Sequence, residues 1–177
     1  MNFVRQLPLV MALGLCAVHA YADDPVNTGG QVNFTGSVNA STCHIDGQND
    51  LNVTMPTVQV GALKAGGNAG DTRFQIHVKC DDGETNKQVR AAFAGPNLDP
   101  NTGNLKNTAD AGSNVEIGLL NADDKSQITV GDQTTVTPVP ITGGAATMTY
   151  FARYSAANGD ATKGAVQSNA TYTLDYE

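Results

Sequence analysis

The chain has 177 residues, and the first 22 are typical of a secretory signal peptide, so they are set aside from the fold. The remaining 155 residues (177 minus 22) are the size of one ordinary domain and can bury a sizeable core. Removing 1–22 takes away one of the ten Lys and Arg residues and none of the 17 Asp and Glu residues, which leaves 9 against 17 and a formal charge of −8. This acidic balance argues against nucleic acid or an anionic membrane as a partner.

Three features indicate the signal peptide. Arg5 gives its start a positive charge, residues 7–18 form an apolar run, and Ala20-Tyr21-Ala22 matches an A-x-A cleavage site. We therefore expect the mature protein to begin at the next residue. The apolar run is too short to cross a bilayer, which takes about 20 residues, so we expect no membrane anchor.

Residues 31–40 alternate strictly between polar and apolar side chains, which predicts a β-strand with one apolar face. Such a strand needs a groove to cover that face. The glycine in the middle of the face marks a close approach to another backbone or to a bulky side chain, unless it is an ordinary edge-strand glycine. The face consists of Val32, Phe34, Gly36, Val38 and Ala40.

Two cysteines remain after the signal peptide, Cys43 and Cys80, in a chain bound for an oxidising compartment. We expect them to form a disulfide; the alternative is a pair of free, buried thiols. Closing a loop of about 38 residues stabilises a fold by roughly 3–4 kcal/mol in the chain-entropy model, which is a large share of a typical domain's stability.

The mature sequence is poor in Leu, Glu, Lys and Arg, rich in Thr, Val, Asn, Gly and Ala, and has no long run of helical period. It therefore predicts an all-β fold, and the short strand-like segments between turn-forming clusters are typical of an antiparallel sandwich. We expect 96–114 to be a long surface loop. The predicted strands are 32–40, 51–55, 74–80, 89–94, 115–121, 127–130, 134–141, 147–154 and 170–176.

Alternation within two of these strands predicts which side chains face the core. In 74–80, the even-numbered residues are apolar and are expected to point inward, with the odd-numbered residues in solvent. In 115–119, the odd-numbered residues are expected to point inward.

The last predicted strand alternates up to the end of the sequence, with Ala170, Tyr172, Leu174 and Tyr176 on one face. Most domains fray at their termini, so an amphipathic strand here suggests that a sheet stops at this point and takes its next strand from elsewhere. An exposed apolar strand edge is an aggregation hazard unless a partner covers it. The alternative is a last strand inside a complete sandwich.

Catalytic or metal-binding chemistry has little support. The mature chain holds two histidines, His44 and His77, which we interpret as a surface residue beside a bridge and a solvated residue on a polar strand face. The carboxylate pairs at 81–82 and 123–124 lie in turns, where Asp is favoured. No segment fits a calcium loop, and Cys and His ligands are too few for a zinc site. We therefore expect no enzyme, no cofactor and no metal site.

Several segments, in their order and spacing, resemble one family. The stretch 29–38 followed by Thr42-Cys43 resembles its opening motif, an alternating strand with a glycine that ends at the first cysteine. The segments 74–80, 115–119 and 151–154 resemble its second-cysteine strand, its central strand and its late A-R-Y strand. Tyr176 is the penultimate residue and Gly164 stands fourteenth from the C-terminus, as in the family's assembly signature. The chain thus resembles the chaperone-usher fimbrial subunits of the type 1 pilin kind.

This resemblance implies an incomplete immunoglobulin-like antiparallel β-sandwich that is completed by a donor strand from another subunit. The implied organisation is a signal peptide at 1–22, an N-terminal donor-strand extension at 23–41 and a pilin β-sandwich domain at 42–177.

The family's functional residues map onto both ends of the mature chain. Val32, Phe34, Gly36 and Val38 would insert as the donor strand. The acceptor groove and the strand that pairs with a chaperone would include Gly164, Tyr172, Leu174 and Tyr176.

The resemblance also implies the partners. In the periplasm a chaperone strand would fill the groove, and the terminal carboxylate of Glu177 would meet basic residues of the chaperone. At an outer-membrane usher, the donor strand of the next subunit would replace the chaperone. Identical or related pilin subunits would then join, donor face to acceptor groove, into an open linear fibre, a cell-surface fimbria that supports adhesion. A two-residue slip preserves the inward face of the donor strand, so its register stays open.

The main alternative is a self-contained secreted β-sandwich that acts as an adhesin or a carbohydrate-binding module. Such modules usually display aromatic platforms, whereas this chain has no Trp and has two of its five Tyr in the C-terminal strand. Within the family, a tip adhesin would carry a further receptor-binding domain, for which 155 mature residues leave no room. We therefore expect a shaft subunit or a minor structural subunit.

Overall fold

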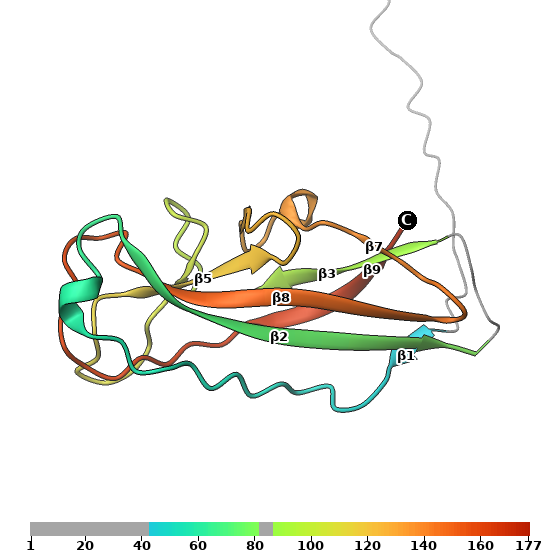
Figure 1. Ribbon diagram of the computed structural model, residues 1–177, viewed down its shortest axis with the longest axis horizontal. Coiled ribbons are helices and arrows are strands. Elements are labelled where there is room, and N and C mark those ends of the chain that lie inside the picture. The colour runs from blue at the N-terminus through green and yellow to red at the C-terminus, as the bar shows by residue number, and fades with distance from the viewer. Residues whose placement is uncertain (1–42, 82–86) are drawn as a thin grey trace, which may run out of the picture. The chain divides into compact units, whose positions relative to one another are not determined.

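The computed structural model describes residues 43–81 and 87–177 (Figure 1). The predicted donor strand at 32–40 and the boundaries of the signal peptide and donor extension lie outside these residues. The elements are β1 (Cys43–Ile45), η1 (Val60–Ala62), β2 (Asn68–Cys80), β3 (Gln88–Ala94), β4 (Leu105–Lys106), β5 (Glu116–Asn121), β6 (Gln127–Ile128), η2 (Gln133–Thr135), β7 (Val139–Pro140), β8 (Ala145–Ser155) and β9 (Thr171–Tyr176).

Two antiparallel sheets account for all of the strands that the structure describes. One has the order β1-β2-β8-β5-β4, with β6 also paired to β5, and the other has the order β7-β3-β9. The prediction of an all-β antiparallel fold is confirmed. The second sheet is much smaller than the first within the described residues, and this imbalance shapes the site described below.

The longest ladder joins β2 to β8, and it bears out the predicted alternation. Ile76 and Val78 are buried, whereas His77 and Lys79 are exposed. β2 begins at residue 68 instead of 74, because β8 supplies hydrogen-bonding partners to a polar, glycine-containing stretch whose composition indicates a turn. The register shifts at Gly70, where a φ of +77° accommodates a bulge.

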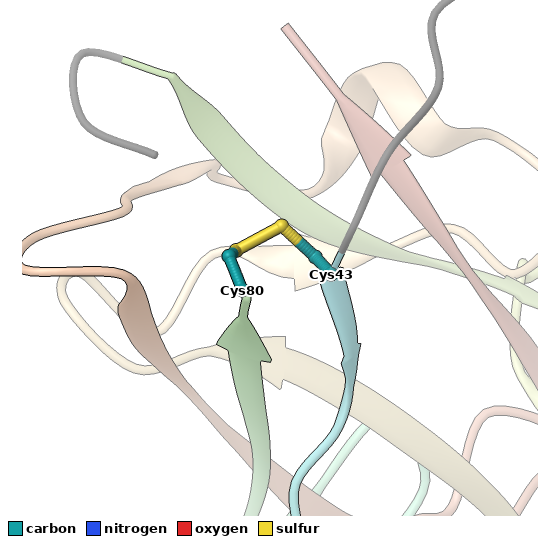
Figure 2. The surroundings of a disulfide bond; sticks show 2 residues. All are labelled: Cys43 and Cys80. Carbon is teal, nitrogen blue, oxygen red and sulfur yellow. A yellow bond between two sulfur atoms is a disulfide. The ribbon is translucent and has the colours of Figure 1, made fainter. Parts of the chain in front are cut away.

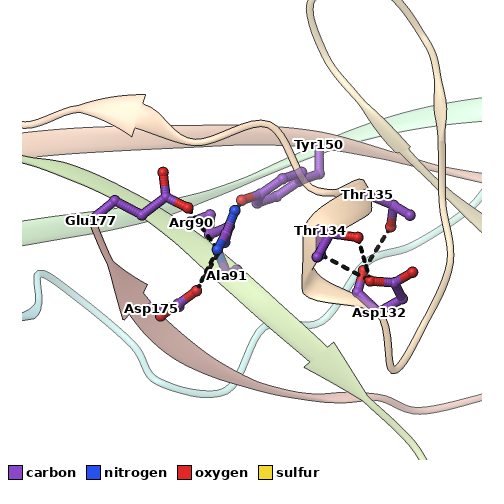
Figure 3. Close-up of polar contacts among 8 residues, drawn as sticks. All are labelled: Arg90, Ala91, Asp132, Thr134, Thr135, Tyr150, Asp175 and Glu177. Atoms are coloured by element: carbon purple, nitrogen blue, oxygen red, sulfur yellow. Dashed lines mark hydrogen bonds and ion pairs between the residues drawn. The ribbon is translucent and has the colours of Figure 1, made fainter. Parts of the chain in front are cut away.

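Aromatic side chains join the two sheets. Phe93 of β3 lies with its ring centroid 5.1 Å from Tyr150 of β8 and 6.3 Å from Phe74 of β2, both edge-on. The Ala91 N–H of β3 donates to the Tyr150 hydroxyl at 3.1 Å (Figure 3). Burial raises the pKa of the Tyr150 hydroxyl, with an opposing, smaller effect of the Ala91 N–H. The hydroxyl thus satisfies a buried backbone donor of the opposite sheet.

The expectation of a long surface loop at 96–114 is wrong in part. Leu105 in β4 is 3% exposed and pairs with β5, and Asn104 is buried. The loop covers the second face of β5, which places Glu116 in the interior at 2% exposure. The Glu116 carboxylate accepts hydrogen bonds from Thr102 at 2.7 Å, Asn104 at 3.0 Å and Asn158 at 2.7 Å. These three hydrogen bonds offset the free-energy cost of burying the carboxylate.

The predicted strand at 134–141 is also mostly wrong. Only the two residues of β7 pair with β3, and the segment begins in η2. Asp132 caps η2: its carboxylate accepts from the Thr134 N–H at 3.0 Å and from the Thr134 hydroxyl at 2.6 Å (Figure 3). These bonds hold the pKa of Asp132 below its ordinary value. Local side-chain bonds of this kind compete with strand pairing.

A disulfide joins Cys43 of β1 to Cys80 at the end of β2 (Figure 2), as predicted. The two cysteines are direct partners in the β1–β2 ladder. The bond therefore anchors a strand of only three residues to the largest sheet.

Replacing both cysteines with serine is expected to lower the free energy of unfolding by about 3–4 kcal/mol, because the unfolded chain regains the freedom of the closed loop. Urea denaturation monitored by circular dichroism measures the change. The wild-type protein should lose a similar amount on reduction, and the double variant should not respond to the reductant. Equal stability of the oxidised wild type and the variant would contradict this expectation.

Tyr150→Phe is expected to destabilise the domain by about 1–3 kcal/mol, because it leaves the buried Ala91 N–H without an acceptor. Tyr154→Phe is the matched control, since the Tyr154 hydroxyl makes no hydrogen bond to the residues that the structure describes. That control should stay within about 0.5 kcal/mol of the wild type. Equal losses in the two variants would show that the Ala91 contact contributes nothing.

Candidate functional site

A groove of about 1130 Å³ opens between two segments that are far apart in the sequence, with polar side chains on its walls and an apolar floor. One wall is 49–55, which follows β1, and the other is 166–174, which includes the first part of β9. The floor consists of core side chains from both sheets, among them Ile76, Phe93, Ile117 and Leu119. The groove therefore leads directly to the interior of the sandwich.

The first wall, 49–55, forms no β-ladder with the described residues. A strand was predicted at 51–55, but between residues 47 and 58 no backbone group hydrogen-bonds to another backbone group within the described parts of the chain. Leu51 and Val53 are 40% and 36% exposed, while Met55 packs against the core. The strand prediction is wrong for this structure because a strand needs a neighbour, and the described residues provide none.

The second wall is the edge of the smaller sheet. β9 pairs with β3 on one side, and no other described strand adjoins it. The predicted strand at 170–176 is confirmed to within one residue. Tyr172 and Leu174 line the groove, and Tyr176 packs against the same core beyond the lining. The Tyr176 hydroxyl is buried and has no hydrogen-bond partner among the described residues.

One side chain links the two walls. The Tyr172 hydroxyl donates to the backbone carbonyl of Asn49 at 2.9 Å. Burial, and to a lesser degree the negative charge of Asp50, raise the pKa of Tyr172. The hydroxyl therefore keeps its proton, and with it the ability to donate, throughout the neutral range.

Ion pairs with β3 hold the C-terminal end of β9 in place. Arg90 of β3 is only 14% exposed in its side chain and pairs with Asp175 at 2.8 Å and with the Glu177 side chain at 2.7 Å (Figure 3). The Gln88 N–H donates at 3.0 Å to the backbone carbonyl oxygen of Glu177. Arg90 could not be predicted as a site residue from the sequence, because its alignment with Asp175 depends on the register between β3 and β9.

The structure does not bring Gly164 into the lining of the groove. Its backbone instead packs against the backbone at Gly112 and Ser113: a Cβ atom built on Gly164 would lie 2.5 Å from Gly112 C and 2.5 Å from Ser113 N. The position thus requires glycine for a close approach of two chain segments. Gly164 fixes the connection that leads from β8 into the second wall.

The described residues contain no group of three or more His, Cys, Asp and Glu side chains that could hold a metal ion. His44 and His77 are exposed, as expected, and the Nδ1 of His77 lies 3.1 Å from the Thr147 hydroxyl. No helix in 43–81 or 87–177 is long and apolar enough to cross a membrane.

Gly164→Ala is expected to lower the free energy of unfolding by about 1–3 kcal/mol, because the added methyl group must displace backbone. Gly61→Ala is the control, since a Cβ there meets nothing within 4 Å. The control should change stability by less than about 0.5 kcal/mol. Thermal and urea unfolding of both variants measure the difference, and similar values for the two would contradict the contact at Gly112.

Comparison with known proteins gives a consistent picture. The model of the family described as "Fimbrial protein" matches residues 32–177. The F17 fimbrial protein of Escherichia coli is 38% identical over 158 residues, which cover 84% of this chain and 87% of that protein. The major fimbrial subunit SMF-1 of Stenotrophomonas maltophilia is 36% identical, with 83% of this chain and 92% of that protein covered.

Solved structures agree at the level of the fold. A subunit in a structure of a chaperone-usher pilus matches with a TM-score of 0.60 and 22% identity, covering 88% of this chain and 100% of that one. The P pilus rod subunit PapA matches with a TM-score of 0.57 and 23% identity, covering 77% and 100%. A type I fimbria protein of Burkholderia pseudomallei matches with a TM-score of 0.54 and 30% identity, covering 81% and 95%. The chain belongs to the fimbrial protein family, and it is a structural subunit of a fimbria with an immunoglobulin-like fold, not an enzyme.

Proposed function

We propose that this subunit polymerises by donor-strand exchange, in which the segment 23–41 of one copy fills the groove of the next. The domain 42–177 would provide the acceptor, with Tyr172, Leu174 and Tyr176 on the strand that receives the donor. The donor face would be Val32, Phe34, Gly36 and Val38.

The observation that supports this proposal most directly is that the two walls of the groove have backbone groups without hydrogen-bonding partners among the described residues. Among the described residues, β9 pairs with a strand on one side only, and 49–55 has no backbone partner. Strands in a sheet lie about 4.8 Å apart, so one added strand can hydrogen-bond to a wall on each side while its alternate side chains point to the floor. Main-chain bonds then give affinity and the pockets give specificity.

The size and character of the groove fit an extended peptide. Small-molecule pockets run to roughly 300–1,000 Å³, and this groove of about 1130 Å³ is larger, with a floor that includes Ile117, Leu119 and Ala152. The segment 31–40 offers a matching apolar face. Because the donor comes from one end of a subunit and the groove lies in another, the contact is heterologous and propagates as a linear fibre of identical or related subunits.

An exposed apolar edge needs cover before assembly. We infer that a periplasmic chaperone fills the groove during export, that an outer-membrane usher is the place of exchange, and that the finished fibre lies at the cell surface and supports adhesion. An uncovered edge such as β9 would otherwise pair with any available strand. The C-terminal end of β9, ordered by Arg90, would present the terminal carboxylate to basic residues of the chaperone.

The test compares the mature chain 23–177 with the chain 42–177, by gel filtration and thermal melting under oxidising conditions. The shorter chain is expected to melt lower or to aggregate, because its groove has no donor. A synthetic peptide of residues 23–41 should restore a stable complex and raise the melting temperature by roughly 5–10 °C at a concentration a hundred times its Kd.

The control is a scrambled peptide of the same composition in which apolar residues no longer alternate, and it should have no effect. A shorter chain that remains a stable monomer, indifferent to the 23–41 peptide, would show that the sandwich is complete in itself. The self-contained binding module would then be the better description.

A further inference from the structure

We propose that the Tyr172 hydroxyl acts as a strap across the groove. It hydrogen-bonds to Asn49 in the strand-free subunit, and this bond must break when a strand enters. This inference concerns the regulation of the groove and rests on the proposed function. It assigns to Tyr172 a role in the timing of exchange, beyond its contribution to the lining.

The contact spans the space that a donor strand would occupy. Tyr172 belongs to β9, and Asn49 lies in the opposite wall. Within the described residues, this is the only hydrogen bond between 46–59 and β9. Because the Asn49 carbonyl is reached from β9, it faces the groove, and it is one of the acceptors that an inserted strand would use.

The bond also has a reason to form in the strand-free state. The Asn49 carbonyl receives no hydrogen bond from the described backbone, so it is available to a side-chain donor across the groove. The Tyr172 hydroxyl supplies that donor. Because the Tyr172 side chain crosses the groove to make this bond, it lies in the path of an entering strand, and the bond must break before the strand can lie between the walls.

Removal of the hydroxyl should therefore speed the uptake of a strand. Tyr172→Phe keeps the ring and its apolar contacts with the core, and it deletes the hydroxyl that hydrogen-bonds to the opposite wall. One neutral hydrogen bond corresponds to about a fivefold effect on an equilibrium or a rate. We expect the rate of uptake to rise by about that factor, with the ring's contribution to the bound state unchanged.

Tyr150→Phe is the matched control. It also removes one tyrosine hydroxyl that makes one hydrogen bond, but Tyr150 lies outside the lining of the groove. Any general loosening of the domain by a lost hydroxyl would appear in this variant as well. Its rate of uptake should equal that of the wild type even though its stability is lower.

The experiment uses the mature chain 23–177, freshly refolded as a monomer, and an excess of a fluorescent peptide of residues 31–41. Fluorescence anisotropy after rapid mixing gives the rate of uptake for the wild type and both variants, and thermal melting confirms that each is folded. A faster rate in Tyr172→Phe alone supports the strap. Equal rates in all three proteins, or the same increase in both variants, would overturn it while leaving donor-strand exchange intact.

A peptide that binds neither these three proteins nor the chain 42–177 would instead overturn both the proposed function and the strap. A second measurement does not depend on a variant. The ¹³Cζ NMR signal of Tyr172 in the wild type reports hydrogen bonding of its hydroxyl, and it should shift when the peptide is added. An unchanged signal in a peptide-bound protein would show that the bond survives insertion, and the strap would be excluded.

Discussion

Two lengths of backbone that face each other without partners constrain the rest of this molecule. β9 has a hydrogen-bonded neighbour on one side only, and 49–55 has none among the described residues. Each unpaired N–H or C=O that loses contact with water costs free energy comparable to a lost hydrogen bond. Any chain that covers the groove must therefore hydrogen-bond to both walls, which a single added strand can do. The groove thus follows from the topology of the sheets.

The interactions that secure the fold surround this gap. The disulfide from Cys43 to Cys80, the Tyr150 contact between the sheets and the Arg90 ion pairs all lie outside the lining of the groove. Arg90 holds the end of β9 against β3, and the disulfide holds the start of the opposite wall against β2. Both walls are therefore anchored at one end, so the gap between them keeps a defined lining and leaves its backbone groups available.

Much of this arrangement could be predicted from the sequence, and the failures have a common cause. Alternation identified β2, β5 and β9, because the alternation of side chains along a strand can be recognised from adjacent residues. The segments 51–55 and 134–141 have strand-like composition but lack full partners, and pairing depends on residues far away in the chain. Glu116 was missed for the same reason: its three hydrogen-bond donors come from two distant loops. Of the site, Tyr172 and Leu174 were predicted, whereas Asn49 and Arg90 depend on register and could not be.

The groove has to meet two opposed demands, and the magnitudes of its interactions show how one hydroxyl can serve both. It must stay open, with an apolar floor that any strand could cover. Its occupant must also be exchanged for the donor strand of the next subunit at the right step of assembly. A strand that pairs with both walls forms several backbone hydrogen bonds, each worth about as much as the one from Tyr172 to Asn49. The strap is therefore too weak to alter the final equilibrium against a full ladder. It acts at the moment of entry, when the incoming strand has formed few bonds of its own and a single opposing bond is a large fraction of what it has gained.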